Sequence, residues 1–144
     1  RTYLRLMITI VKSNFNQQVI DGLLTGCMQA LKESGIEKEA VSIIEVPGAF
    51  EIPYTVKNIL SDEKNDVQAI ITLGCVIKGE TDHYDYISQA VTNSIMNLTI
   101  SSKIPILFGV LTCQNAQLAF DRSDANMKKN KGYEVGQAAI KMIN

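Results

Sequence analysis

His83, the only histidine in the chain, follows an apolar run that ends in a short charged loop, in the segment GCVIKGETDHYDYI (residues 74–87). An imidazole has an unperturbed pKa of about 6.5, so it can both donate and accept a proton near neutrality. One interpretation is an ordinary surface histidine flanked by Asp82 and Asp85. The other is a catalytic acid and base. The position after a strand-like run favours the second interpretation, because open α/β sheets bind ligands at the carboxyl ends of their strands.

The segment VPGAFEIP (residues 46–53) could hold a flat ligand with polar edges. Its Pro47-Gly48 pair is a turn dipeptide that lets the backbone approach a ligand closely. Phe50 offers an aromatic face, and Glu51 offers an acceptor for hydroxyl or amine donors. Phe15, in the loop after the first apolar run, offers a second aromatic face. The alternative for both phenylalanines is a ring that folds back onto the core.

An anion could be held near Gly79 and Thr81, which precede a helical pattern. Free backbone amides and the helix dipole favour negative charge at a helix N-terminus. Arg122 could fork onto a phosphate or a carboxylate. Taken alone, Arg122 and Lys131 are more readily explained as solvated surface charges.

The composition favours one globular domain over residues 1–144, with 46% hydrophobic and 20% charged residues. A formal net charge of −1 gives no electrostatic case for binding nucleic acid or an anionic membrane. No apolar run approaches the roughly eighteen residues of a transmembrane helix. No segment has the pattern of a signal peptide, and a first residue other than methionine is consistent with a trimmed N-terminal arm.

The three cysteines, Cys27, Cys75 and Cys113, are far apart and form no Cys-x-x-Cys pair. This spacing argues against a disulfide framework and against a structural zinc site. Cys27 and Cys75 fall in apolar patterns, where cysteine behaves as a small hydrophobe, whereas Cys113 follows a strand and could be accessible. The cysteines indicate a reducing compartment, and we expect a cytoplasmic protein.

Strand-like and helical patterns alternate along the chain. Uniformly apolar runs, typical of strands covered on both faces, predict strands at residues 4–11, Val41–Val46, Ala69–Ile77 and 104–111. Helical spacing predicts helices around residues 19–31, with a stop near Gly35, and at residues 53–60, 84–98, 115–121 and 133–142. The order implies a three-layer α/β/α sandwich with a four-stranded parallel sheet, flavodoxin-like in layout.

The loops after the four predicted strands are residues 13–16, 46–53, 78–83 and 112–115. The carboxyl ends of parallel strands meet at one edge of a sheet, so these loops should form one crevice. Phe15, Phe50, Glu51 and His83 are therefore expected to share a site.

Several separated motifs, in this order, resemble the lumazine synthase family. They are FN at Phe15-Asn16, VPGAFEIP, GxVIxGxTxHxDY at residues 74–86, PxxFGVLT at residues 105–112 and NKG at residues 130–132. The resemblance covers almost the whole chain, and the set is far more specific than any single motif. It implies the same α/β/α fold and a transferase that acts at the penultimate step of riboflavin biosynthesis.

The implied reaction condenses 5-amino-6-(ribitylamino)uracil with 3,4-dihydroxy-2-butanone 4-phosphate and yields 6,7-dimethyl-8-ribityllumazine, phosphate and water. No cofactor and no metal are expected. The resemblance also implies a homo-oligomer and a functional link to riboflavin synthase. Residues 123–129 depart from the family's usual glycine-rich version, in a loop that bears on higher assembly. A homopentamer is therefore favoured over a sixty-subunit shell.

The resemblance assigns roles residue by residue. Phe15 matches the aromatic that stacks on the pyrimidine ring, and His83 matches the general acid and base. The positions that match the site of the heterocycle and its ribityl chain are Phe15, Ala49, Phe50, Glu51, Val76 and Ile77.

A second group of positions matches the family's phosphate site and the subunit boundary. Glu80 and Thr81 match loop positions at the phosphate, and Arg122 matches the phosphate-binding arginine. Phe108 and Lys131 match residues that, in the family, come from the neighbouring subunit together with Arg122.

Two other classes of protein use the same layout. A flavin- or nucleotide-binding module would use the crevice without catalysis. A receiver-type signalling domain needs an acidic cluster after the first strand, where Ser13-Asn14 supplies none.

Overall fold

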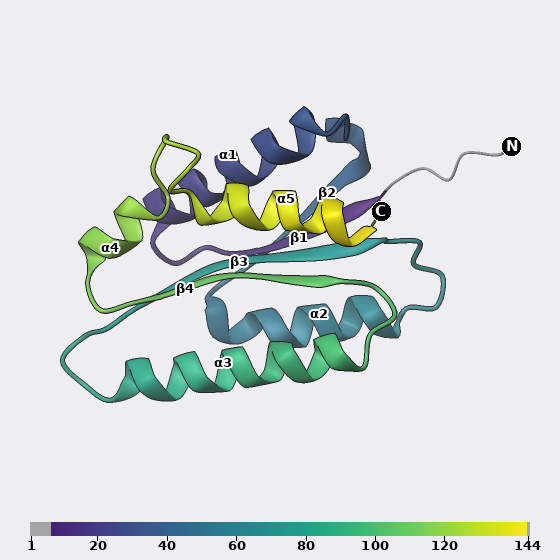
Figure 1. The fold of residues 1–144 in the computed structure, drawn as a ribbon. Helices are drawn as coiled ribbons and strands as arrows, with labels where there is room; N and C mark the ends of the chain where they lie inside the picture. Colours follow the sequence, from purple (N-terminus) through teal and green to yellow (C-terminus); the bar gives the residue numbers. More distant parts are fainter. Residues whose placement is uncertain (1–6, 144) are drawn as a thin grey trace, which may run out of the picture.

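The computed structural model describes residues 7–143, with a four-stranded parallel sheet at the centre (Figure 1). The strands are β1 (Ile8–Ser13), β2 (Val41–Val46), β3 (Ala69–Ile77) and β4 (Ile106–Cys113). They lie in the order β2-β1-β3-β4, and every pairing is parallel, as predicted. β1 and β3 are therefore central, whereas β2 and β4 form the edges.

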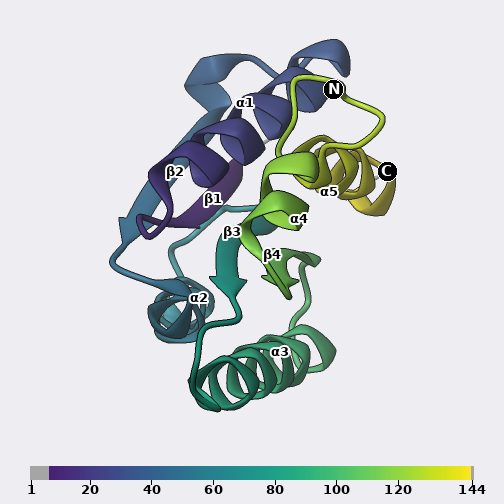
Figure 2. The same ribbon diagram turned by 90° about the vertical axis from the view of Figure 1, so that its left-hand side faces the viewer.

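Helices cover both faces of the sheet. α1 (Gln17–Glu33) and α5 (Lys131–Ile143) lie on one face, and α2 (Ile52–Ser61) and α3 (His83–Ile100) lie on the other, as Figures 1 and 2 show. The short helix α4 (Ala116–Asp121) follows β4. Single turns of 3-10 helix, η1 (Lys38–Ala40) and η2 (Ala49–Glu51), precede β2 and α2. The predicted three-layer sandwich is confirmed.

Apolar side chains fill the spaces on both sides of the sheet. Ile10 of β1 packs with Leu23 of α1 in one cluster, and the adjacent Val11 packs with Ile95 of α3 in the other. Successive side chains of a strand point to opposite faces, so one strand serves both clusters. β3 is buried along almost its whole length, which explains its unbroken apolar sequence.

α1 and α5 approach each other at backbone distance because glycines lie at their contact. A Cβ atom at Gly132 would lie 1.9 Å from the carbonyl oxygen of Leu23, and one at Gly136 would lie 2.8 Å from the Cβ atom of Ala30. Both distances are shorter than a side chain tolerates, so only glycine fits this separation of the helices. The sequence patterns do not predict this contact.

The predicted bounds of the first and last strands in the sequence, β1 and β4, are wrong by a few residues. β1 continues to Ser13 instead of ending at Val11, because it stays paired with β2 and Lys12 Nζ lies 2.7 Å from Glu45 Oε2. Residues 4–6 of that predicted strand lie outside the described residues. β4 starts after Pro105, which has no backbone N–H to donate.

Cys113 ends β4 and is buried, so the expectation of an accessible thiol is wrong. Its carbonyl oxygen accepts a hydrogen bond from the Lys78 amide at 2.9 Å, which continues the pairing with β3 beyond the predicted end. All three cysteines are free.

Gly35 has φ +85° just after α1, as expected of a residue that ends a helix. Within residues 7–143, no helix is both long and apolar enough to cross a membrane.

Candidate active site

A pocket of about 400 Å³ opens at the carboxyl ends of β1, β2 and β3, at the edge of the sheet where the sequence predicts a crevice. The fourth loop of that prediction, residues 112–115, does not line it. This volume is in the range of small-molecule sites. Its walls are the loop after β1, the loop and η2 turn after β2, and the end of β3 with the start of α3. The lining residues are Phe15, Pro47, Gly48, Ala49, Phe50, Glu51, Cys75, Val76, Ile77, Gly79, Thr81, His83, Tyr84 and Ile87.

The pocket brings together most of the predicted site residues. These are Phe15, Ala49, Phe50, Glu51, Val76, Ile77, Thr81 and His83. Glu80, Phe108, Arg122 and Lys131 do not line it.

Larger hollows lie elsewhere on the molecule. One of about 540 Å³ lies between the C-terminal ends of α2 and α3, and one of about 890 Å³ lies beside α1. Neither contains a predicted site residue. The smaller pocket is the stronger candidate, because it gathers aromatic rings, a carboxylate, a hydroxyl and the imidazole in one place.

Two aromatic rings face solvent at the pocket. Phe15 is 61% exposed and Phe50 is 57% exposed, so the alternative in which they fold back onto the core is wrong. Asn16 takes a left-handed conformation with φ 62° at the N-cap of α1, and this sharp turn holds the preceding Phe15 outside the core. Exposed aromatic faces in one pocket are suited to stacking on a flat heterocycle.

The loop after β2 holds a carboxylate beside its own backbone. The Glu51 amide donates to the Gly48 carbonyl oxygen at 3.1 Å, which closes the η2 turn. A Cβ atom at Gly48 would lie 3.2 Å from Glu51 Oε1, so glycine leaves room for this carboxylate. Ala49 is buried and anchors the turn, while Val76 and Ile77 end β3 at the pocket. The loop thus presents backbone groups and an acid over an apolar surface.

His83 is the first residue of α3 and is exposed at the pocket. Its backbone amide donates to Thr81 Oγ1 at 3.2 Å, so the threonine hydroxyl sits at the N-terminus of the helix. This arrangement places the imidazole, the hydroxyl and the positive end of the helix dipole together. Glu80 is exposed on the same loop, outside the pocket lining.

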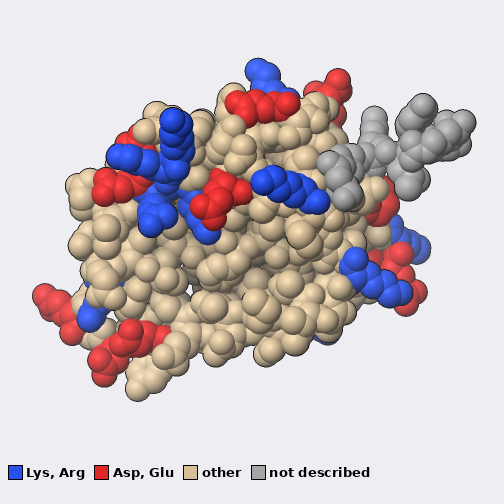
Figure 3. All heavy atoms as spheres, viewed as in Figure 1, with Lys and Arg blue, Asp and Glu red and all other residues tan. Residues whose placement is uncertain are grey.

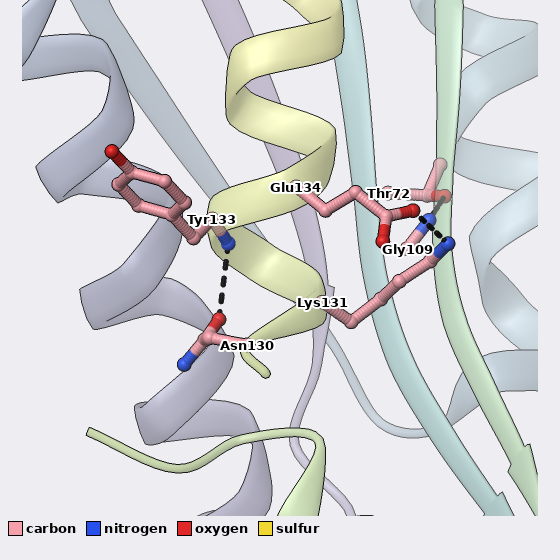
Figure 4. Close-up of polar contacts among 6 residues, drawn as sticks. All are labelled: Thr72, Gly109, Asn130, Lys131, Tyr133 and Glu134. Atoms are coloured by element: carbon pink, nitrogen blue, oxygen red, sulfur yellow. Dashed lines mark hydrogen bonds and ion pairs between the residues drawn. The ribbon is translucent and has the colours of Figure 1, made fainter. Parts of the chain in front are cut away.

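The two predicted cations lie near each other but away from the pocket lining. Arg122 is the C-cap of α4 and Lys131 starts α5. The Lys131 amide donates to the Arg122 carbonyl oxygen at 2.8 Å, and Lys131 Nζ lies 2.6 Å from Glu134 Oε2 (Figure 4). Phe108 lies on the edge strand β4, half-buried. None of the three residues lines the pocket of its own chain, and their role toward a neighbouring subunit stays a prediction.

The thiols near the site are held protonated by burial. Burial, and secondarily the nearby Cys113, raise the pKa of Cys75 to about 12. Burial also raises the pKa of Cys113, although the positive charge of Arg122 acts in the opposite direction. A thiolate nucleophile at neutral pH is therefore disfavoured at both positions.

Sequence reasoning does not single out Tyr84 and Ile87 as pocket residues. Both lie in the first turns of α3, and Ile87 belongs to a helical stripe that is typical of core packing. Their closeness to His83 along one helix is the signal that could have identified them. Among residues 7–143, no three His, Cys, Asp or Glu side chains gather in a way that could hold a metal ion.

Comparisons with known proteins identify the family of the chain. The family model described as 6,7-dimethyl-8-ribityllumazine synthase matches residues 5–144. The chain is also 43% identical, over 137 residues, to the 6,7-dimethyl-8-ribityllumazine synthase of Leuconostoc mesenteroides subsp. mesenteroides. That alignment covers 95% of this chain and 86% of the relative. The chain therefore belongs to the 6,7-dimethyl-8-ribityllumazine synthase family.

Proposed function

We propose that the pocket at the carboxyl ends of β1, β2 and β3 is the active site for the family's reaction in this chain. There, 5-amino-6-(ribitylamino)uracil condenses with 3,4-dihydroxy-2-butanone 4-phosphate to give 6,7-dimethyl-8-ribityllumazine, phosphate and water. The observation that carries the proposal is that residues from three separate loops, which the family resemblance assigns to binding this substrate pair, line one pocket.

The heterocyclic substrate binds against the aromatic and apolar part of the pocket. The exposed ring of Phe15 stacks on the pyrimidine, and Val76 and Ile77 contact the heterocycle from the end of β3. The η2 turn, with Phe50 and the Glu51 carboxylate, receives the ribityl hydroxyls and the ring edge. Holding the amine and the ketone in register contributes to the rate by itself, because a bimolecular step becomes effectively unimolecular.

His83 moves the protons that the reaction requires. The amine of the uracil attacks the ketone, and an imine forms with loss of one water. Phosphate then leaves by elimination, and the ribitylamino nitrogen closes the second ring on the remaining carbonyl with loss of a second water. Each step transfers a proton, and an exposed imidazole at the wall of the pocket is placed to relay it.

Negative charge on the departing phosphate is stabilised at the N-terminus of α3 and by cations. The amides near Thr81 lie at the positive end of the helix. Arg122 and Lys131 bind the phosphate, and Glu80 lies near it. Phe108 contacts the heterocyclic substrate. We assign Arg122, Lys131 and Phe108 to a neighbouring copy, because none of them lines the pocket of its own chain.

The assembly that supplies these residues is a homopentamer. β4 is an edge strand, so its outer edge is available for association. Figure 3 shows mostly uncharged atoms across the middle of the face over β4 and α3, with the charged groups toward the periphery. A heterologous contact of this kind must close into a ring to avoid open filaments.

The free cysteines support a reducing, cytoplasmic setting. Riboflavin synthase is the expected consumer of the product.

One experiment separates this enzyme from a flavin- or nucleotide-binding module of the same fold. Both substrates are mixed with the protein, and lumazine fluorescence is followed together with phosphate release. The proposal expects the two signals to rise together in a fixed ratio. Binding of the heterocycle without phosphate release would instead support the non-catalytic module, which family membership does not favour.

A further inference from the structure

We propose that Asn130 is a positioning residue that holds Arg122 and Lys131 in the geometry needed to bind the phosphate of the substrate. The inference rests on the phosphate-binding role proposed above for these two cations. It concerns the segment that joins α4 to α5, which carries one cation at each end.

The two ends of this segment are tied together directly. Arg122 closes α4 and Lys131 opens α5, and the Lys131 amide donates to the Arg122 carbonyl oxygen at 2.8 Å. Residues 123–130 form the loop between them. A movement of this segment relative to α1 therefore displaces the backbone of both cations together.

The Asn130 side chain forms hydrogen bonds with α1, with the loop and with α5. It is 2% exposed, and its Nδ2 atom donates to the carbonyl oxygens of Gly22 in α1, at 3.0 Å, and of Asp124 in the loop, at 2.9 Å. Its Oδ1 atom accepts the Tyr133 amide at 3.0 Å, at the start of α5 (Figure 4). Both amide hydrogens and the amide oxygen are thus used, and one side chain links α1, the loop and α5.

α1 is shaped to receive this side chain. A Cβ atom at Gly26 would lie 2.2 Å from Asn130 Oδ1, and one at Gly22 would lie 2.2 Å from the Ser123 carbonyl oxygen. Two glycines one turn apart therefore leave a slot for the ends of the loop. Asn130 seated in this slot sets where Arg122 and Lys131 stand relative to the sheet.

An aspartate at position 130 would separate two roles of the Asn130 side chain, capping α5 and holding the loop against α1. Aspartate has the same shape and can still accept the Tyr133 amide as an N-cap. However, it has no N–H to give to the carbonyl oxygens of Gly22 and Asp124, and it would place a carboxylate against both. Asn130→Asp therefore keeps the cap of α5 and releases the loop.

The test compares the assembled wild-type protein with Asn130→Asp and with a matched control, Tyr133→Phe. The control removes the hydrogen bond from Tyr133 Oη to Glu33, which also joins α5 to α1 but does not involve the loop. Inorganic phosphate is titrated calorimetrically into each protein, and KM is measured for both substrates. We expect Asn130→Asp to weaken phosphate binding and raise KM for the phosphorylated ketone by about tenfold, with KM for the uracil substrate unchanged. Tyr133→Phe should match the wild type in both measurements.

Every other result overturns the inference. Wild-type affinity for phosphate in Asn130→Asp, an equal rise of both KM values, or the same change in Tyr133→Phe would reduce Asn130 to a structural residue. If Asn130→Asp does not fold, Asn130→Ser replaces it, because serine caps a helix but lacks the two amide donors. The phosphate titration needs no turnover. Asn130-dependent phosphate binding without lumazine formation would therefore refute the proposed function alone, and absence of phosphate binding by the wild type would refute the inference.

Discussion

Replacing Gly132 with alanine should destabilise the fold by about 3 kcal/mol, because α5 meets α1 at backbone distance. The new Cβ atom would lie 1.9 Å from the carbonyl oxygen of Leu23, and also 2.6 Å and 2.9 Å from its C and Cα atoms. All three are backbone atoms, which cannot rotate away. The start of α5 would have to retreat by about 1.5 Å to reach an ordinary contact of 3.4 Å. Overpacking of this kind typically costs about 1–3 kcal/mol, and a rigid neighbour places the cost at the upper end.

Thermal unfolding followed by circular dichroism at fixed protein concentration measures this effect. For a chain of this size, about 3 kcal/mol lowers Tm by roughly 10 °C. Gly79→Ala is the matched control, since nothing lies within 4 Å of a Cβ atom there, and its Tm should equal that of the wild type. Gly35→Ala also enters open space but at φ +85°, so it should cost only about 1–2 kcal/mol of backbone strain.

The ranking of the three glycine variants decides the outcome. If Gly132→Ala melts within 2 °C of Gly79→Ala, the two helices do not meet at backbone distance and the explanation of this contact is wrong. If Gly35→Ala is the most destabilised, conformational strain rather than close packing dominates the glycine positions.

Further predictions concern the site and the thiols. His83→Ala should slow the reaction without abolishing it, because water or substrate groups can move protons less efficiently. Arg122→Ala should lose more, about 2–4 kcal/mol or tens- to several-hundred-fold in kcat/KM, and Arg122→Lys should recover only part of it. A milder effect of Arg122→Ala than of His83→Ala, in variants that still assemble, would show that the phosphate role is misassigned. Co-assembly of the two impaired variants should raise activity above that of either variant alone, and verified mixed oligomers with no such gain would argue against shared sites. Burial raises the pKa of Cys27 from 9.0 to about 12, so its contribution to stability is complete below pH 9 and is lost as pH rises toward 12. Cys27→Ala should therefore show a shallower fall of Tm above pH 9 than the wild type, and equal slopes would contradict the assigned cause.

Most of the pocket is predictable from the sequence because its residues follow strands. The loops after parallel strands share one edge of the sheet, so Phe15, Phe50 and His83 meet whatever the detailed packing. Their roles stay predictions that rest on the resemblance. The position of Tyr84 in the pocket could not be predicted, because Tyr84 lies next to the apolar stripe of a helix and belongs to no motif or spacing that indicates a site. Phe108 and Arg122 lie outside the pocket lining, and their assignment to a neighbouring copy of the chain stays a prediction.

The sequence by itself determines the elements, their order and the edge of the sheet where the chemistry lies. Strands and helices leave apolar residues at spacings of about two to four positions along the sequence. The strands Val41–Val46 and Ala69–Ile77 can therefore be predicted from the sequence. Only the tertiary structure decides the strand order β2-β1-β3-β4, the close contact of α1 with α5 and the seat of Asn130. These features depend on contacts between distant positions: the Asn130 side chain meets Gly22 across a separation of 108 residues. No local pattern encodes such a contact, because its free energy exists only once both partners have been brought together.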